Sequence, residues 1–75
     1  MYKFLADWKG VVVDYNPTYR KRKDTGIQYM LKKIAETQKF ANGMFNKPVT
    51  LFVYQKINGA YKEIEVIEVP ETMEL

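Results

Sequence analysis

The sequence contains neither cysteine nor histidine among its 75 residues. Without cysteine the chain has no disulfide, no thiolate zinc ligand and no thiol nucleophile, and a small domain without disulfides is typical of a reducing, intracellular setting. Without histidine it also lacks the commonest general base and metal ligand. We therefore expect a cytoplasmic protein that is not an enzyme and that has no catalytic residue, metal or cofactor.

Glycine-rich phosphate loops and long apolar runs are also missing. The four glycines are isolated, each at an expected turn or helix end, and the acidic residues do not have the spacing of a magnesium or calcium site. The longest apolar runs, residues 11–13 and 51–53, are far shorter than the ~20 residues of a membrane span. The first residues are charged too often for a signal peptide, so we expect no membrane association.

The residues that are present predict one folded domain over 1–75. Hydrophobic residues make up 47% of the chain, aromatic residues make up 15%, and the net charge is only +3. Disordered chains instead have few aromatic residues and a large charge imbalance. The excess of lysine over arginine, with many Ile, Asn, Tyr and Phe, resembles the products of AT-rich genomes, such as those of low-GC bacteria and their phages.

Alternating residues predict a hairpin at the start of the chain. Residues 2–6 and the β-branched residues 11–13 are expected to form its two strands, and Pro17 ends the second strand. Residues 16–24 are then expected to form a polar loop.

A helix is predicted to begin at Thr25, which has Gln28 three positions later in the arrangement of a capping box. Asn42 and Gly43 supply a left-handed stop at its end. One apolar stripe of this segment would cover a sheet. Its members are Ile27, Met30, Leu31, Ile34, Ala41 and Phe45.

A second hairpin is predicted in the last third of the chain. Residues 49–57 alternate with large β-forming side chains, the Asn-Gly pair at 58–59 is a strong signal for a two-residue turn, and the return strand covers about 61–69. The alternation of the return strand changes phase, which predicts either a bulge or burial on both faces. Residues 71–75 are expected to form a frayed tail.

The order of elements is therefore ββαββ. One helix packed on a mostly antiparallel four-stranded sheet is the natural arrangement for this α+β fold. Strand residues such as Leu5, Val12, Phe52 and Tyr54 supply more apolar side chains than one face of the sheet requires. This surplus indicates a surface for a partner or for a second copy of the chain, unless the facing of these residues is assigned wrongly.

The basic loop, defined as Tyr19, Arg20, Lys21, Arg22 and Lys23, is a candidate anion site. Cations beside a helix N-terminus favour anion binding, because the unpaired backbone N–H groups and the helix dipole add to their charge. Arginines suit phosphates and a tyrosine suits a base, which is the hypothesis of nucleic-acid or nucleotide binding. The alternative is a solvated loop whose charge aids solubility.

Charge is divided unevenly along the chain. Residues 1–47 carry a net charge of +6, and residues 48–75 carry −3. If this separation survives folding, it would steer the protein toward a charged partner. The acidic second part disfavours nucleic-acid binding by the whole surface.

The outer side of the helix carries Tyr29, Lys33 and Phe40, and the lone Trp8 lies in an expected turn. Aromatic residues flanked by charges on a face that should be wet are typical of interface anchors. The alternative is that Phe40 folds into the core, that Tyr29 lies flat on the surface and that Trp8 caps the edge of the core.

These observations favour a small, non-catalytic module that occupies the surface of a protein partner as an adaptor or inhibitor. Small phage proteins that take over a host or block its defences fit the size and composition by analogy. Tyr29, Lys33, Phe40 and Trp8 would anchor the partner, and the basic loop would steer association with an acidic protein surface. The alternatives are nucleic-acid binding through the basic loop and a structural subunit that forms homo-oligomers.

Overall fold

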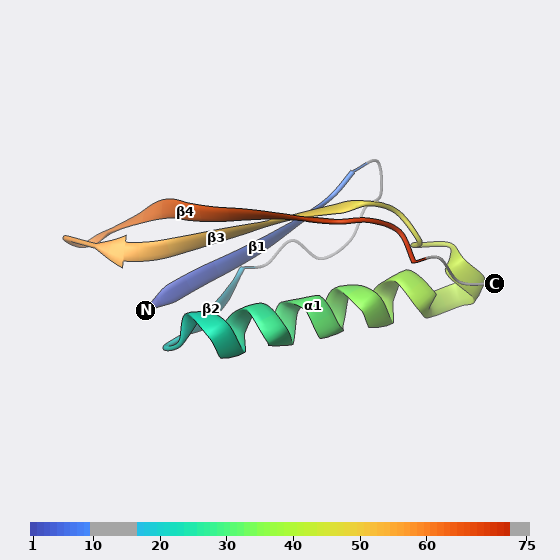
Figure 1. Ribbon diagram of the computed structural model, residues 1–75, viewed down its shortest axis with the longest axis horizontal. Helices are drawn as coiled ribbons and strands as arrows, with labels where there is room; N and C mark the ends of the chain where they lie inside the picture. Colours follow the sequence, from blue (N-terminus) through green and yellow to red (C-terminus); the bar gives the residue numbers. More distant parts are fainter. Residues whose placement is uncertain (10–16, 73–75) are drawn as a thin grey trace.

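The computed structural model describes residues 1–9 and 17–72, which form one helix laid across a four-stranded sheet (Figure 1). The described strand pairs are antiparallel, and the strand order is β2-β1-β3-β4. The elements in chain order are β1 (Tyr2–Trp8), β2 (Thr18–Arg20), α1 (Lys23–Lys39), the 3-10 turn η1 (Phe40–Gly43), β3 (Val49–Ile57) and β4 (Ala60–Val69). This arrangement confirms the predicted ββαββ order and the α+β class.

The edge strand β2 pairs with β1. The sequence analysis assigned its residues to a polar loop. Thr18 lies opposite Phe4, and Arg20 lies opposite Tyr2. Threonine and tyrosine favour extended backbone, and pairing with β1 satisfies backbone groups that a loop would leave to water. The start of the predicted basic loop is therefore a strand. The strand predicted over residues 11–13 lies outside the described residues.

The helix α1 begins at Lys23, two residues before the predicted start at Thr25. The predicted capping box is not formed, because the N-cap residue is Arg22, whose side chain makes no capping hydrogen bond. In the first turn, Asp24 Oδ1 instead accepts a hydrogen bond from the backbone N–H of Thr25 at 2.8 Å. This carboxylate satisfies one of the backbone donors that a helix start leaves without a helical partner.

The helical segment ends on left-handed residues, as the sequence predicts. The α-helix gives way to η1 at Phe40, and Ala41, Asn42 and Gly43 then have φ values of 53°, 57° and 82°. Asparagine and glycine adopt this conformation at lower cost than most residues. Ala41 is exposed in this turn, so its assignment to the buried stripe was wrong.

The helix packs its apolar stripe against the inner face of the sheet. Met30 and Ile34 are buried, and Ile27, Leu31 and Phe45 are partly buried against the same core. The two central strands contribute alternate side chains to this core. These side chains are Phe4, Trp8, Val49, Leu51 and Val53.

Gly26 allows α1 to approach the sheet closely. It is buried in the first turns of the helix, and a methyl group at this position would overlap the ring of Phe4. Glycine inside a helix costs about 1 kcal/mol relative to alanine. A glycine is needed here because the Phe4 ring occupies the space that a larger side chain would fill. The sequence analysis assigned this glycine only to a helix end.

The strands β3 and β4 form the second predicted hairpin. Ile57 and Ala60 pair across a two-residue turn, in which Asn58 and Gly59 have φ values of 51° and 80°. Positive φ at both central residues is the mark of a type I′ turn, which suits the twist of the flanking strands. The turn expected from the Asn-Gly pair is therefore confirmed.

One extra residue, Ile64, is inserted in β4 between the partners of Val53 and Tyr54. A bulge was one of the two predicted explanations for the change of phase in this strand. Beyond it, Ile67 packs against the core, whereas Val66 is exposed. Because of the bulge, Tyr61 and Glu63 lie on the same face of the sheet as Val66 and Glu68 instead of the face of Ile67.

Two side-chain amides fasten the end of the sheet that lies beside η1. Gln38, only 1% exposed on α1, donates hydrogen bonds from Nε2 to the carbonyl oxygens of Lys47 (3.0 Å) and Pro70 (2.9 Å). Asn46 Oδ1 accepts hydrogen bonds from the backbone N–H and from the hydroxyl of Thr72. Asn46 Nδ2 donates a hydrogen bond to the carbonyl oxygen of Thr72. These bonds hold the first part of the expected tail, whose last three residues lie outside the described residues.

Candidate binding surfaces

The face of the sheet opposite α1 is covered by no described helix or strand (Figure 1). Alternation along the paired strands directs one set of side chains to this surface, which we call the open face. Its members are Tyr19 from β2, Lys3, Leu5 and Asp7 from β1, Thr50, Phe52, Tyr54 and Lys56 from β3, and Tyr61, Glu63, Val66 and Glu68 from β4. Three of the surplus apolar residues noted in the sequence therefore lie here, and the fourth, Val12, lies outside the described residues.

An apolar row crosses the middle of the open face. Leu5, Phe52 and Val66 are paired neighbours on β1, β3 and β4. Val66 is 44% exposed, and the other two side chains are partly accessible. On one side of this row, the Thr50 hydroxyl donates a hydrogen bond to Glu68 Oε1 at 2.9 Å. That side of the open face is therefore polar and acidic.

A cluster of tyrosines lies on the other side of the row. The ring centroids of Tyr19 and Tyr61, which come from the two edge strands, are 5.8 Å apart. The Lys3 ammonium lies 4.5 Å from the ring centre of Tyr54 and 5.3 Å from that of Tyr61. Cation–π attraction of this kind stabilises an ammonium among aromatic rings. We call these four residues the tyrosine cluster.

The predicted basic loop is divided by the structure among three elements. Tyr19 and Arg20 are the last two residues of β2, and Lys23 is the first residue of α1. Lys21 and Arg22 connect the strand to the helix. Because neighbouring strand residues point to opposite faces, Tyr19 joins the open face while Arg20 points toward the helix. The five residues therefore do not form one loop that could close around a single anion.

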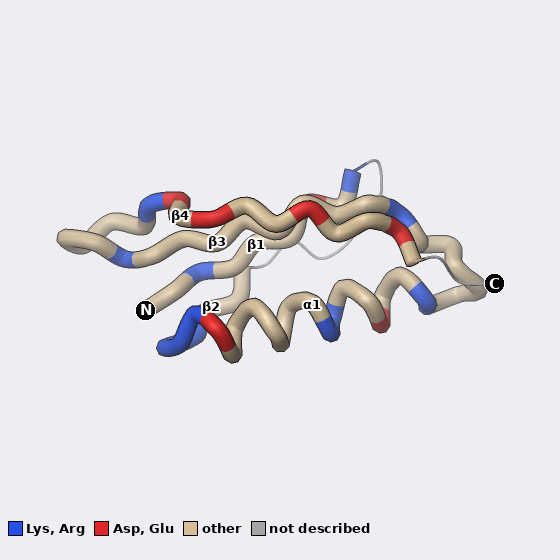
Figure 2. The backbone as a smooth tube through the Cα atoms, viewed as in Figure 1, with Lys and Arg blue, Asp and Glu red and all other residues tan. Residues whose placement is uncertain are grey.

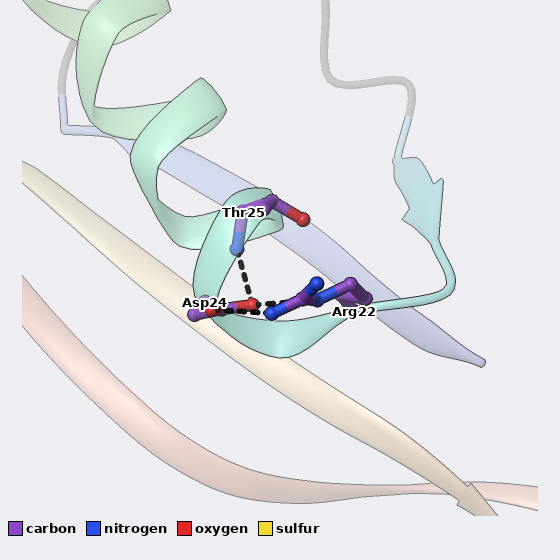
Figure 3. A network of polar contacts seen from close by, with 3 residues as sticks. All are labelled: Arg22, Asp24 and Thr25. Atoms are coloured by element: carbon purple, nitrogen blue, oxygen red, sulfur yellow. Dashed lines mark hydrogen bonds and ion pairs between the residues drawn. The ribbon is translucent and has the colours of Figure 1, made fainter.

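The cations at the start of α1 are partly neutralised by carboxylates. Arg22 forms an ion pair with Asp24 at 3.0 Å (Figure 3), and the Lys23 ammonium lies 2.9 Å from Glu65 Oε1 on β4. Asp24 also occupies the backbone N–H of Thr25 (Figure 3). These contacts weaken the case for a phosphate at this helix N-terminus.

Two pKa shifts follow from these contacts. The backbone N–H of Thr25 and then the Arg22 guanidinium lower the pKa of Asp24 below its ordinary value of 3.8. The hydrogen bond to Glu65 raises the pKa of the Lys23 ammonium above its ordinary value of 10.5. Both groups are therefore held in their charged forms at neutral pH.

The uneven charge of the sequence becomes a difference between two ends of the molecule. Figure 2 shows several blue segments close to the N-terminus, β2, the start of α1 and the β3–β4 turn, and other blue segments along α1 and toward its far end. This basic end contains seven cations (Lys3, Arg20, Lys21, Arg22, Lys23, Lys56 and Lys62) and three anions (Asp24, Glu63 and Glu65). The rest of the chain has five cations and six anions, so the positive charge is concentrated at one end.

Three of the four residues predicted as partner anchors are exposed on or directly after α1, and the fourth, Trp8, is buried. Tyr29 and Lys33 are exposed on α1, and the Arg20 guanidinium lies 4.5 Å above the Tyr29 ring. Phe40 is 65% exposed and does not fold into the core. Trp8 is only 5% exposed and points to the inner face opposite Val49. It is a core residue rather than a surface anchor.

The end of the helix carries a second apolar surface, which sequence reasoning noticed only in part. Phe40 and Met44 are 65% and 66% exposed, and we call them the helix-end patch. The Phe40 ring stacks on Phe45 with centroids 6.0 Å apart, and Phe45 in turn packs against the core. A polar depression of about 380 Å³ is formed by neighbouring residues of the same turn and tail. Its lining is Gln38, Lys39, Asn42, Gly43, Asn46 and Thr72.

Residues 1–9 and 17–72 contain no group of His, Cys, Asp and Glu side chains arranged to hold a metal ion. Across the same residues, no helix has the length and apolar character needed to cross a membrane. The fold defines the class of the protein, a two-layer α+β domain in which no described helix or strand covers the second face of the sheet. No family model, curated protein or solved structure matches the chain.

Proposed function

We propose that this protein is a cytoplasmic, non-catalytic module that acts by occupying the surface of a protein partner. The helix-end patch is the observation that carries the proposal. Exposed phenylalanine and methionine side chains within one turn of the chain are characteristic of interface anchors, because their burial removes a large apolar area from water.

The patch has a rigid foundation. Phe40 stacks on Phe45, which packs against the core, and the hydrogen bonds of Gln38 fix the chain on either side of the turn. A side chain that is already ordered loses little conformational entropy when it binds. The adjacent polar depression adds the exposed side chains of Lys39 and Asn42, which could contact polar groups of a partner.

The remaining predicted anchors extend the same proposal along the helix. Tyr29 lies eleven positions before Phe40, or about 16 Å along the helix axis. Lys33 lies between them and is exposed. The partner favoured by this arrangement has an apolar pocket for Phe40 and an acidic surface, toward which the basic end steers association.

The test is affinity capture from source-cell lysate with matched variants. Phe40→Ala and Tyr29→Ala should each weaken retention of a specific protein by roughly tenfold, the usual loss at an anchor residue. The matched control is Ile57→Ala, which removes another exposed apolar side chain at the opposite end of the molecule.

Thermal unfolding of each variant accompanies the capture. Unchanged melting temperatures would show that the lost binding is a surface effect. A clear loss of stability in both variants would identify Phe40 and Tyr29 as structural residues, and equal retention by all variants would remove the helix-end patch from the proposal.

A further inference from the structure

The tyrosine cluster and the basic end of the molecule coincide. Tyr19 belongs to both, because it precedes Arg20 in β2 and faces the open side of the sheet. Tyr54 and Tyr61 reach the same place from β3 and β4. The fold thus assembles three aromatic rings on a cationic background from segments that are far apart in the sequence.

Several cations around this cluster have side chains available for a ligand. Lys21, Lys56 and Lys62 are exposed, and no ion pair or ring contact involves them among the described residues. Lys56 lies opposite Tyr61 on the open face, whereas Lys62 pairs with Gln55 and points to the other side of the sheet. Lys56 therefore flanks the rings at the hairpin end, and Lys21 follows β2 at the other edge.

From this juxtaposition we infer that the basic end of the open face binds single-stranded nucleic acid. Nucleotide bases stack on Tyr19, Tyr54 and Tyr61, while the exposed lysines contact the phosphates. Aromatic side chains on a sheet are suited to bases because every base has a π-face, and lysines beside them attract the backbone by charge.

The accessible rings favour single strands over duplexes. Tyr19 is 47% exposed and presents its ring at the surface, whereas a duplex hides the faces of its bases within the stack. An acidic peptide would match the positive charge but would leave the three rings without stacking partners. The combination of rings and lysines therefore selects a ligand with both flat bases and regular negative charge.

The charges on the open face also determine where a bound nucleic-acid chain can lie. Asp7 and Glu68 lie on the open face beyond the apolar row, and they repel phosphates. A nucleic-acid chain that crosses the β-strands at the basic end avoids both carboxylates, and Glu63, which lies opposite Tyr54, is the one carboxylate of the open face that it passes among the described residues. The site is therefore short and spans the width of the sheet rather than its length.

The apolar anchor of the proposed function, the helix-end patch, lies at the other end of α1 (Figure 1). The two proposals share only the cations of the basic end, so Phe40→Ala should leave nucleic-acid binding in place, and Tyr19→Leu should leave binding of the protein partner in place. A protein bound at Phe40 and a nucleic acid bound at the tyrosine cluster do not compete for the same residues.

The experiment is fluorescence anisotropy with a labelled oligothymidylate of about 15 nucleotides, a length within the usual site sizes. The RNA counterpart and a duplex of equal length are titrated in parallel, at low and at physiological salt. We expect micromolar or tighter binding of a single strand at low salt, weaker binding as salt rises, and a clear preference over the duplex.

Variants separate stacking from charge. Tyr19→Leu and Tyr61→Leu should each weaken binding roughly tenfold, while Tyr19→Phe, which retains the ring, should bind nearly as well as the natural protein. Lys56→Gln should reduce the dependence of affinity on salt. Lys32→Gln is the matched charge control, because Lys32 is exposed on α1 away from the open face, and its affinity should change little.

Several results would overturn the inference. Absence of binding at low salt, equal binding of the duplex, or unchanged affinity in both Tyr→Leu variants would each do so. A labelled oligoglutamate peptide is included as a competitor. If it binds as tightly as oligothymidylate and depends on the same residues, the site is one for acidic peptides instead.

Discussion

The two faces of the sheet are built from alternating residues of the same strands, but their surroundings differ. Val49, Leu51 and Val53 of β3 are fully buried on the inner face, whereas Phe52 and Tyr54 from the same strand are partly accessible on the open face. Both sets are apolar, so hydrophobicity alone does not decide which set forms the core. The position of the single helix decides it, and stability should therefore depend mainly on the inner set.

The largest effect is expected when this comparison is tested with neighbouring residues. Leu51→Ala should lower the free energy of unfolding by about 2–5 kcal/mol, because it removes a fully buried side chain and leaves a cavity. Phe52→Ala should cost about 1 kcal/mol or less, since its side chain already contacts water. Urea-induced unfolding of both variants, followed by circular dichroism, measures the difference.

An equal loss of stability in the two variants would break the comparison. It would mean that the open face is covered in solution, and light scattering would then distinguish a second copy of the chain from a monomer. A concentration-dependent mass that Phe52→Ala abolishes would favour the homo-oligomer that the apolar surplus of the sequence left as an alternative.

The next effect concerns the contact between the helix and the inner face. Gly26→Ala should destabilise the protein by about 1–3 kcal/mol, because the added methyl group overlaps the Phe4 ring and overpacks the core. The same substitution on an exposed helix would stabilise by about 1 kcal/mol. Urea unfolding therefore distinguishes the two cases by the sign of the change.

A second substitution sharpens this prediction. Phe4→Leu removes the ring atoms that the methyl group would overlap, so Gly26→Ala should cost less in that background than in the natural protein. Equal costs in the two backgrounds would show that the close approach of α1 to Phe4 is not the reason for the glycine.

Local sequence patterns were enough to predict those elements whose conformation depends on a few neighbouring residues. The apolar stripe of α1, the Asn-Gly turn at 58–59 and the left-handed stop at 42–43 all depend on a few adjacent residues. Their conformations follow from periodicity and from φ preferences. The predicted ββαββ order also needed a second strand, which was placed at residues 11–13 outside the described residues, whereas the second described strand is β2 (Thr18–Arg20).

Features that depend on pairing between distant strands were not predictable in the same way. The strand β2 is short and exists through its register with β1. Trp8 belongs to the inner face because it lies opposite Val49, which the sequence alone does not specify. The tyrosine cluster likewise requires the strand order, since its four residues come from four strands.

The same difference between local residues and distant pairing applies to the candidate surfaces. The exposure of Phe40 and Tyr29 could be predicted from helical periodicity, because residues on one side of a helix share their environment. The neutralisation of the basic loop could not, since Lys23 meets Glu65 only through packing of the helix against β4.

The smallest predicted effect lies at the start of α1 and depends on pH. The folded-state pKa of Asp24 is lowered, so its carboxylate adds stability at pH values above its unfolded pKa, near 3.8. That contribution is lost as the pH falls through the lower folded pKa. Asp24→Asn should therefore be less stable than the natural protein at neutral pH, and the difference should shrink in acid.

Arg22→Gln identifies which contact is responsible. The backbone N–H of Thr25 is the largest single cause of the lowered pKa, and the Arg22 guanidinium lowers it further through a hydrogen bond and through its charge. In the Arg22→Gln background, Asp24→Asn should therefore still reduce stability more at neutral pH than in acid. Thermal unfolding of the single and double variants between about pH 2 and pH 7 measures this difference. If the difference disappears with Arg22, the ion pair is the main contact of Asp24. The carboxylate would then act mainly as a partner for the basic segment, and the helix start would depend on it less than its hydrogen bond to Thr25 implies.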